Sequence, residues 1–282
     1  MSRGLGAHEI AAFAQEACVV EVSARKPGNV SPERDFEDTA YEDFLLSAVA
    51  IGPALGRAAE TGVGEAVLAA VEATRRCVQA NTNLGIVLLL APLACAAGRE
   101  PGPVRAALSR VLSSLSAADT RAAYAAIRLA NPGGLGRVPT HDVRDETTAT
   151  LGEVMALAAE RDTIAREYVT DYDVTFRLAV PAIREARARG GSRRTAAAEA
   201  YLRVLSEVPD TLIARKEGAA TARAVSARAA EVLRAGPAGS AARARAEEAF
   251  DGELRERGNR LNPGTSADLV AAALFVALVE ER

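Results

Sequence analysis

The sequence predicts an all-α fold, a single compact multi-helix domain of about ten to twelve helices that spans residues 1–282. Alanine is abundant, and alanine is the best helix former and a poor strand former. Aromatic residues make up only 4% of the chain and tryptophan is absent, which disfavours a β-sandwich or a barrel. Apolar residues recur at helical spacing, and no alternation of polar and apolar residues is long enough to build a sheet.

The composition is typical of one large globular domain. Hydrophobic residues make up 49% of the 282 residues and charged residues 25%, which excludes a mostly disordered chain. The formal net charge is −3, whereas a general nucleic-acid binder would carry a basic excess. We therefore expect no nucleic-acid partner, although a local basic pocket for phosphates is compatible with this charge.

The apolar segments predict no membrane attachment. The first twenty residues lack a basic start followed by an apolar run, so we expect no signal peptide. The longest apolar stretch, residues 84–97, is shorter than the about 20 residues that a bilayer span needs. Cys18, Cys77 and Cys95 lack metal-ligand spacing, so buried, reduced thiols in a cytoplasmic protein are expected.

The first helices are predicted from their apolar stripes. Residues 10–20 carry such a stripe, and the polar stretch 23–38 is expected to be an ordered loop. Residues 41–60 show helical spacing, with Pro53 as a kink or break. Residues 65–79 are amphipathic, and residues 84–97 are apolar nearly all round, which predicts a central buried helix.

The rest of the chain continues the helical pattern. Two helices are expected within residues 103–130, and the glycine- and proline-rich residues 131–145 are expected to form a second loop. The last expected helix is apolar, and the charged helix before it is expected to face solvent. The expected helices after the second loop span residues 146–159, 164–189, 193–205, 211–234, 241–256 and 267–278.

Four polar junctions between apolar helices are where we expect chemistry. They are residues 23–30 followed by Asp38 and Asp43, residues 81–85, residues 210–218 and residues 262–268. Taken singly, their amide and hydroxyl residues can be helix caps and their glycines turn residues. Together they supply helix N-termini, two cations and several carboxylates, which suits a polyphosphate with a divalent metal.

Other sites are disfavoured. The chain has no GxxxxGK[ST] and no GxGxxG after a strand, so neither a P-loop nor a Rossmann site is expected. His8 and His141 are the only histidines, which excludes a histidine-rich zinc set. Asp171 and Asp173 do not share a helical face, so they are not expected to be a metal pair.

In their order along the chain, the four junctions resemble the triphosphoribosyl-dephospho-CoA synthase family. The residues that carry the resemblance are Glu21 to Val30 (EVSARKPGNV), Asp38 with Asp43, Asn81-Thr82 with Gly85, Asp210-Thr211 with Arg215 and Gly218, and Pro263-Gly264 with Ser266 to Leu269. The resemblance implies an all-helical pentosyltransferase that moves the triphosphoribosyl group of ATP to 3′-dephospho-CoA and releases adenine.

The resemblance also implies roles for the junction residues. Catalysis and Mg²⁺ binding would be divided among Asp38, Asp210 and Asp268. The phosphates and the nucleotide would be held by Lys26, Gly28, Asn29, Asn81, Thr82, Asn83, Arg215, Lys216 and Ser266. Nucleotides would be the small-molecule partners, and the alanine-rich helices could pack into a homodimer.

One departure from the family pattern leaves alternatives open. Members of the citrate-lyase type carry His-Lys-Gly after Asn-Thr, where this chain has Asn83-Leu84-Gly85. A relative that uses another phosphorylated donor or acceptor, for example in the synthesis of a one-carbon carrier, is therefore the first alternative. The second is a non-catalytic helical scaffold or nucleotide-binding protein whose polar junctions are mainly caps.

Overall fold

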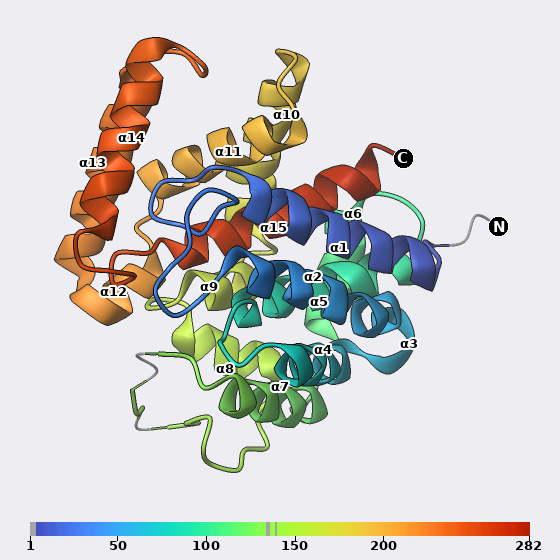
Figure 1. Cartoon of the computed structure of the whole chain (residues 1–282). Coiled ribbons are helices and arrows are strands. Elements are labelled where there is room, and N and C mark those ends of the chain that lie inside the picture. The colour runs from blue at the N-terminus through green and yellow to red at the C-terminus, as the bar shows by residue number, and fades with distance from the viewer. Residues whose placement is uncertain (1–3, 134–135, 139) are drawn as a thin grey trace.

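The structure, a computed structural model, describes residues 4–133, 136–138 and 140–282 (Figure 1). Within these residues the chain forms fifteen α-helices, one short π-helix and no strand, so the all-α prediction is confirmed. The expected ten to twelve helices were too few. The helices are α1 (Ala7–Ser23), α2 (Tyr41–Gly56), α3 (Ala58–Thr61), α4 (Val63–Cys77), α5 (Leu84–Arg99), α6 (Val104–Ser113), α7 (Ala117–Ala130), α8 (Leu151–Ala158), α9 (Thr163–Val169), the π-helix η1 (Thr175–Ala179), α10 (Val180–Ala188), α11 (Arg193–Glu207), α12 (Thr211–Glu217), α13 (Ala219–Arg234), α14 (Ala241–Arg255) and α15 (Gly264–Glu280).

Breaks inside three expected helices account for the higher number. Residues 41–60 divide at Arg57 rather than at Pro53, which lies inside α2. Residues 164–189 are interrupted after α9, where Asp171 and Tyr172 adopt positive φ angles of 51° and 58°. Residues 211–234 divide at Gly218, whose φ of 89° ends α12.

Two other expectations need correction. The helix expected over residues 146–159 begins only at Leu151, because Thr150 caps it by accepting the amide of Glu153. Cys18 and Cys95 are buried as expected, but Cys77 is exposed. The second loop, residues 131–145, connects α7 to α8 as predicted, with residues 134–135 and 139 lying outside the described residues.

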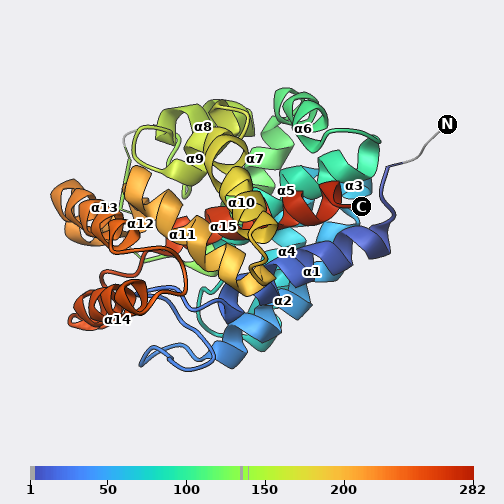
Figure 2. The same cartoon turned by 90° about the horizontal axis from the view of Figure 1, so that it is seen from above.

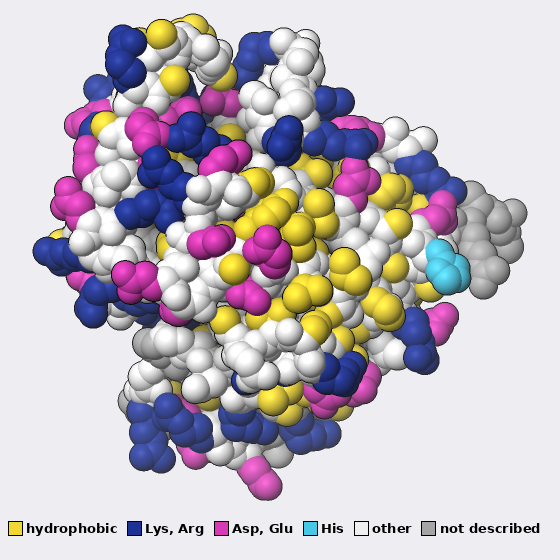
Figure 3. Space-filling view, viewed as in Figure 1, with side chains coloured by type: hydrophobic (Ala, Val, Ile, Leu, Met, Phe, Trp, Pro, Cys, Tyr) yellow, Lys and Arg dark blue, Asp and Glu magenta, His cyan; other side chains and the backbone are white. Residues whose placement is uncertain are grey.

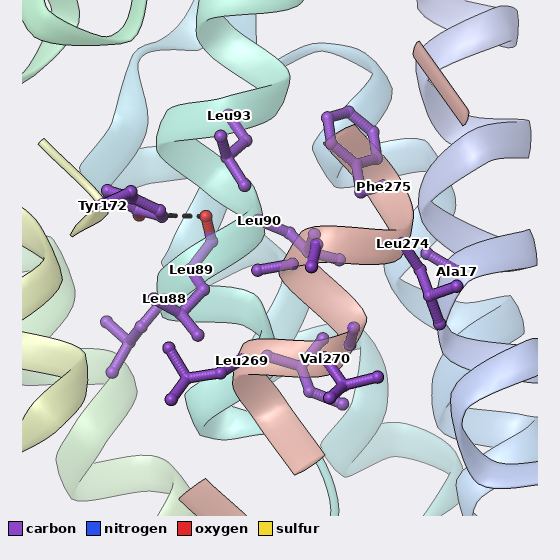
Figure 4. Packing of buried hydrophobic residues seen from close by; sticks show 14 of the residues in the cluster. Ala17, Leu88, Leu89, Leu90, Leu93, Tyr172, Leu269, Val270, Leu274 and Phe275 are labelled. Carbon is purple, nitrogen blue, oxygen red and sulfur yellow. Dashed lines mark hydrogen bonds between the residues drawn. The ribbon is translucent and has the colours of Figure 1, made fainter. Parts of the chain in front are cut away.

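The core is built around α5 and α15, which cross at the centre of the molecule (Figure 4). Leu90 of α5 and Phe275 of α15 are fully buried, and α1, α10 and α11 pack against α15. The prediction of a central buried helix over residues 84–97 is confirmed. Both helices begin on the same side of this core, so their N-terminal turns lie near each other.

Two helix-interior prolines are compensated by side chains from neighbouring helices. A proline has no amide hydrogen, so Pro53 and Pro92 leave the carbonyls of Val49 and Leu88 without their usual donors. The Gln15 amide donates to the Val49 carbonyl at 2.8 Å, and the Tyr168 hydroxyl donates to the Leu88 carbonyl at 2.6 Å. These bonds allow both helices to continue through their prolines.

The outer helices leave two surface features. Helices α13 and α14 pack against each other at one edge of the molecule (Figures 1 and 2). Apolar side chains gather across the face formed by α1 and α2 (Figure 3), where Leu46 and Val49 are exposed. No single helix among the described residues is long and apolar enough to cross a membrane; the bent pair α5 and α6 passes that test only when its two helices are taken together.

Candidate functional site

The four polar junctions meet at the N-terminal ends of α5 and α15. The Asp210 carboxylate accepts the backbone amide of Ser266 at 2.8 Å and its hydroxyl at 2.9 Å, which joins the third junction to the fourth. A Cβ atom at Gly28 would lie 3.1 Å from the Pro263 ring, so the first junction also touches the fourth. The structure therefore brings together polar segments that are far apart in the sequence.

Asp210 links two helix N-termini. Its Oδ1 accepts the amides of Leu212 and Ile213 at 2.9 and 3.1 Å and caps α12, while its Oδ2 accepts both donors of Ser266 at the start of α15. The side chain is buried, and this burial raises the pKa of Asp210 although the hydrogen bonds oppose the rise. Both oxygens are thus engaged in holding the junctions together.

Asp268 has a different environment. Within the described residues its carboxylate takes part in no hydrogen bond and no ion pair. Removal from water raises the pKa of Asp268 well above its usual value, and the nearby charges of Glu21, Asp210 and Asp162 raise it further, against the effect of Arg215. Asp268 is therefore an unpaired acid among other carboxylates, and it holds a proton more readily than an exposed aspartate does.

Gly85 makes room for this carboxylate in the first turn of α5. A Cβ atom on Gly85 would lie 2.0 Å from Asp268 Oδ2 and 2.8 Å from the Ile164 methyl group, both far inside normal contact. The absent side chain lets Asp268 approach the α5 backbone closely. This contact joins the second junction to the fourth.

A small pocket, partly open to solvent, lies beside this centre between α1, α2 and α5, and the space in it that a water-sized sphere can enter is about 10 Å³. Glu21, Ser47 and Thr82 contribute polar groups to its wall, and the hydroxyls of Ser47 and Thr82 lie 2.5 Å apart. The other lining residues are Cys18, Val22, Phe44, Ala48, Asn83 and Ile86. Burial, followed by the Glu21 and Asp268 charges, raises the pKa of Cys18, so this thiol stays protonated and is no nucleophile.

The loop after α1 is held by buried polar contacts. The Lys26 ammonium is fully buried and lies 3.0 Å from the Glu21 carboxylate and 3.0 Å from the Ala24 carbonyl. The Gly28 amide donates to Asp251 of α14 at 2.7 Å, and the Asn29 amide donates to the Tyr201 hydroxyl at 2.9 Å. In this arrangement Lys26 neutralises Glu21 and orders the loop, so a phosphate contact would require its ammonium to leave Glu21.

The second junction is also occupied by local bonds. Asn81 accepts the amide of Leu84 at 3.2 Å and caps α5, and Asn83 donates to the Thr74 hydroxyl at 3.0 Å. Thr82 and Asn83 still line the cavity wall, whereas Asn81 is exposed. Thr82 and Asn83 are therefore better placed than Asn81 to contact a ligand in this cavity.

Two cationic side chains of α12, those of Arg215 and Lys216, follow each other in the sequence, and the charge of Arg215 acts on Asp268. Arg215 pairs with Asp162 at 3.1 Å, and the Lys216 ammonium donates to the Asn259 carbonyl at 3.0 Å. Asn259 in turn donates to the exposed Asp38 carboxylate at 3.0 Å. Burial lowers the pKa of Lys216, while the charge of Asp38 opposes this.

The predicted magnesium ligands do not form a ready-made cage. Among the described residues, no three histidine, cysteine or acidic side chains lie where they could hold one metal ion. Mg²⁺ is usually bound by one or two carboxylates together with substrate phosphates, so a closed protein cage is not required. Of the predicted trio Asp38, Asp210 and Asp268, only Asp268 has a carboxylate without a partner in the described structure.

Several residues of this region were not among the sequence-derived candidates. Glu21 lies within the quoted motif, so its position could have suggested a role. Ser47, Asn259 and two arginines described below lie outside the motifs, and only folding brings them near the junctions. In addition, the Asn262 Oδ1 atom is buried without a hydrogen-bond partner in the described structure.

Comparisons with known proteins show to which family the chain is similar. A family model described as ATP:dephospho-CoA triphosphoribosyl transferase matches residues 7–282. The chain is 35% identical over 100 residues to a 2-(5″-triphosphoribosyl)-3′-dephosphocoenzyme-A synthase of Klebsiella pneumoniae, a match that covers 36% of this chain and 35% of the relative. It is 30% identical over 105 residues to a protein of Pseudomonas syringae pv. tomato that is named as a probable synthase of the same kind. That match covers 37% of this chain and 35% of the relative.

A solved structure extends the likeness over most of the chain. The crystal structure of an Archaeoglobus fulgidus protein, assigned as a triphosphoribosyl-dephospho-CoA synthase, superposes with a TM-score of 0.65 and 27% identity. That match covers 84% of this chain and 98% of the archaeal one. The matches to the two curated relatives span only about a third of their length.

Proposed function

Since the chain belongs to the ATP:dephospho-CoA triphosphoribosyl transferase family, we propose that it moves the triphosphoribosyl group of ATP to the 2′-hydroxyl of 3′-dephospho-CoA and releases adenine. The observation that carries this proposal is the unpaired Asp268 carboxylate where the four junctions meet. The roles of the individual residues are part of the proposal.

The proposed reaction is a substitution at the anomeric carbon of the ATP ribose. The bond from this carbon to adenine breaks and its electron pair leaves with adenine, which gains a proton. The acceptor 2′-oxygen forms the new bond and loses its proton, so that one proton is taken up and one is given off. Positive charge develops on the ribose as adenine leaves, and a nearby carboxylate stabilises such charge. Glu21 lies in the cavity wall and would take this role, although its ion pair with Lys26 reduces the charge that it offers.

We assign the proton transfer to Asp268. A general base works best when its pKa lies near the working pH, and the pKa of Asp268 is raised in that direction by burial and neighbouring carboxylates. Asp268 would take the proton of the attacking 2′-hydroxyl. Asp210, with four hydrogen bonds, would keep the starts of α12 and α15 in place.

The remaining candidates would bind the nucleotide. Thr82 and Asn83 line the cavity and would contact the sugar or base, and Arg215 and Lys216 would contact phosphates. A Mg²⁺ ion would be held mainly by the phosphates, and it would supply positive charge against the triphosphate. Lys26 and the Gly28–Asn29 turn would act by holding the cavity wall.

The test is the release of adenine. Purified protein incubated with ATP, Mg²⁺ and dephospho-CoA should release one adenine for each dephospho-CoA consumed, measured by chromatography. Asp268→Asn should lower the rate by at least about a hundredfold, since removing a general base typically costs that much. Asp173→Asn, which changes an exposed acid paired with Arg177, is the matched control and should keep the wild-type rate. If folded wild-type protein releases no adenine with dephospho-CoA, the proposed activity is wrong.

A different acceptor is the second candidate. The observation behind it is Asn83, which stands where citrate-lyase-type members carry histidine and whose amide is turned toward Thr74. Adenine release that requires an acceptor other than dephospho-CoA would favour this candidate.

A further inference from the structure

Two arginines outside the predicted motifs converge on one buried carboxylate. Arg257 Nη1 lies 3.2 Å from a Glu217 oxygen, and Arg260 Nε bonds the other oxygen of the same carboxylate. The Glu217 side chain is only 9% exposed, whereas those of Arg257 and Arg260 are 66% and 61% exposed. The carboxylate thus anchors two guanidinium groups whose outer faces are open to solvent.

The turn that carries these arginines is attached to α12. Lys216 of α12 donates to the Asn259 carbonyl at 3.0 Å, between the two arginines in sequence. The charge of Arg260 is also among the causes that lower the pKa of Lys216, which places these two cations near each other. Residues from two separate segments therefore form one cationic cluster, which comprises Arg215, Lys216, Arg257 and Arg260.

This cluster has hydrogen-bond donors that no protein group uses in the described structure. A guanidinium has five N–H donors, and in the described structure Arg257 and Arg260 each direct only one to Glu217. The carboxylates of Glu217 and Asp162 pair with the arginines, and those of Asp38, Asp210 and Asp268 lie near Lys216 or Arg215. Unused donors on positively charged groups suit a ligand that carries several negative oxygens.

The cluster also has a fixed relation to the chemical centre. Arg215 is the cation that acts on the Asp268 carboxylate. Lys216 follows it on α12, and Arg257 and Arg260 lie on the turn between α14 and α15, which contacts α12. In ATP the triphosphate is attached to the same ribose whose anomeric carbon would react near Asp268. A ribose at Asp268 can therefore direct its phosphates toward this cluster.

We propose that Arg257 and Arg260, together with Arg215 and Lys216, form the binding site for the triphosphate of the donor nucleotide, and this inference rests on the proposed function. The four cations match a triphosphate better than the diphosphate of dephospho-CoA, which carries fewer charges. Glu217 holds the two arginines in place without ligand and competes with phosphate for their donors.

The first test uses inorganic tripolyphosphate, which requires no turnover. Calorimetric titration of the full chain should show saturable binding that weakens as salt is added. The double variant Arg257→Gln/Arg260→Gln should weaken this binding about tenfold, because two charged contacts are lost. Arg110→Gln, which removes an exposed arginine paired with Glu100, is the matched control and should bind as the wild type does.

A second variant distinguishes ligand binding from a structural role. Glu217→Gln removes the competing carboxylate charge, so tripolyphosphate should bind severalfold more tightly. If Glu217 and the arginines only stabilise the turn, Glu217→Gln weakens binding or leaves it unchanged, and the proposal is overturned.

Steady-state kinetics distinguish a binding site for ATP, the donor, from a binding site for dephospho-CoA, the acceptor. The double variant should raise the KM for ATP about tenfold and leave the KM for dephospho-CoA near the wild-type value. A change confined to dephospho-CoA, or unchanged ATP and tripolyphosphate binding in an active enzyme, overturns the proposal. Arginine-dependent tripolyphosphate binding by a protein that releases no adenine would instead refute the proposed activity and support the phosphate site.

Discussion

Asp210 and Asp268 have the same side chain in two contrasting environments. Asp210 accepts four hydrogen bonds that join two helix N-termini, whereas Asp268 accepts none within the described residues. Burial raises the pKa of both, but only Asp268 has neighbouring carboxylates among the main causes. The two residues should therefore have opposite effects on stability when their charge is removed.

Replacing Asp268 should stabilise the fold while abolishing activity. Because the folded pKa of Asp268 is raised, the folded protein keeps this proton longer than the unfolded chain does, and its contribution to stability falls as pH rises from 3.8 to the folded pKa. Above that interval the wild type carries the full penalty, which Asp268→Asn removes. We expect a higher Tm for Asp268→Asn at about pH 8 and little difference near pH 4, measured by thermal unfolding.

Asp210→Asn provides the contrast. An asparagine there turns an NH₂ group toward backbone donors of α12 or α15, so the Tm should fall at neutral pH. A rise in Tm for Asp210→Asn, or a fall for Asp268→Asn, would contradict the environments described above.

Gly85 should act on the reaction through Asp268. Gly85→Ala forces the carboxylate away from its position, so kcat should fall at least about tenfold while the fold is retained. In an Asp268→Asn background the same alanine should have little further effect on kcat, because the group that it displaces is already inactive. Equal losses in both backgrounds would show that Gly85 acts independently of Asp268. Gly152→Ala, at a glycine with open space around it, is the control.

At the level of elements, α2 and α5 show how tertiary contacts modify helix rules. Proline inside a helix usually bends or ends it, and from sequence Pro53 was expected to do so. In the structure Gln15 and Tyr168 donate to the carbonyls that the two prolines leave free. Neither donor could be identified from the sequence, because each comes from another helix.

The Tyr168 bond should contribute to stability only while Pro92 is present. Tyr168→Phe leaves a buried Leu88 carbonyl without this donor and should lower the free energy of unfolding by about 1–3 kcal/mol. In a Pro92→Ala background the restored backbone amide can satisfy that carbonyl, so Tyr168→Phe should cost much less. Urea unfolding of the four proteins in this cycle measures the difference, and equal costs in both backgrounds would contradict the interpretation.

Most helices were predictable, and the missed breaks have local causes. Apolar spacing located α1, α4, α5, α11 and α15 to within a few residues. The break after α9 depends on positive φ angles at Asp171 and Tyr172; aspartate adopts such angles more often than most residues, but tyrosine gives no such signal. Gly218 was visible in the sequence, but a lone glycine can also lie inside a helix, so its role as a terminus was missed.

Across the whole molecule, the sequence indicated that the four junctions form one site. It did not indicate which of their side chains are free to bind a ligand and which are engaged in internal contacts. The motifs were recognised by their order along the chain, which resembles that of a known family. The fold brings them to the starts of α5 and α15. The sequence could not show that Lys26 is buried against Glu21, because both the phosphate and the internal role suit a lysine. The assigned roles of the site residues stay predictions until they are tested.

The α5–α15 core should dominate global stability. Leu90 is fully buried, so Leu90→Ala should lower the free energy of unfolding by about 2–5 kcal/mol. Leu157 is 56% exposed, and Leu157→Ala should change the free energy of unfolding by less than about 0.5 kcal/mol. Denaturant titrations of both variants check this, and similar losses at the two positions would contradict the central place of α5.

The crossing of α5 and α15 also constrains the order of events during biosynthesis. Most of the polypeptide separates these two helices, so α5 leaves the ribosome long before the helix that covers it. Until α15 emerges, the apolar surface of α5 lacks its permanent neighbour and is open to chaperones or to other nascent chains. The same late step completes the proposed reaction centre, since Asp268 arrives with α15, so on this assignment the protein gains its stability and its chemistry together.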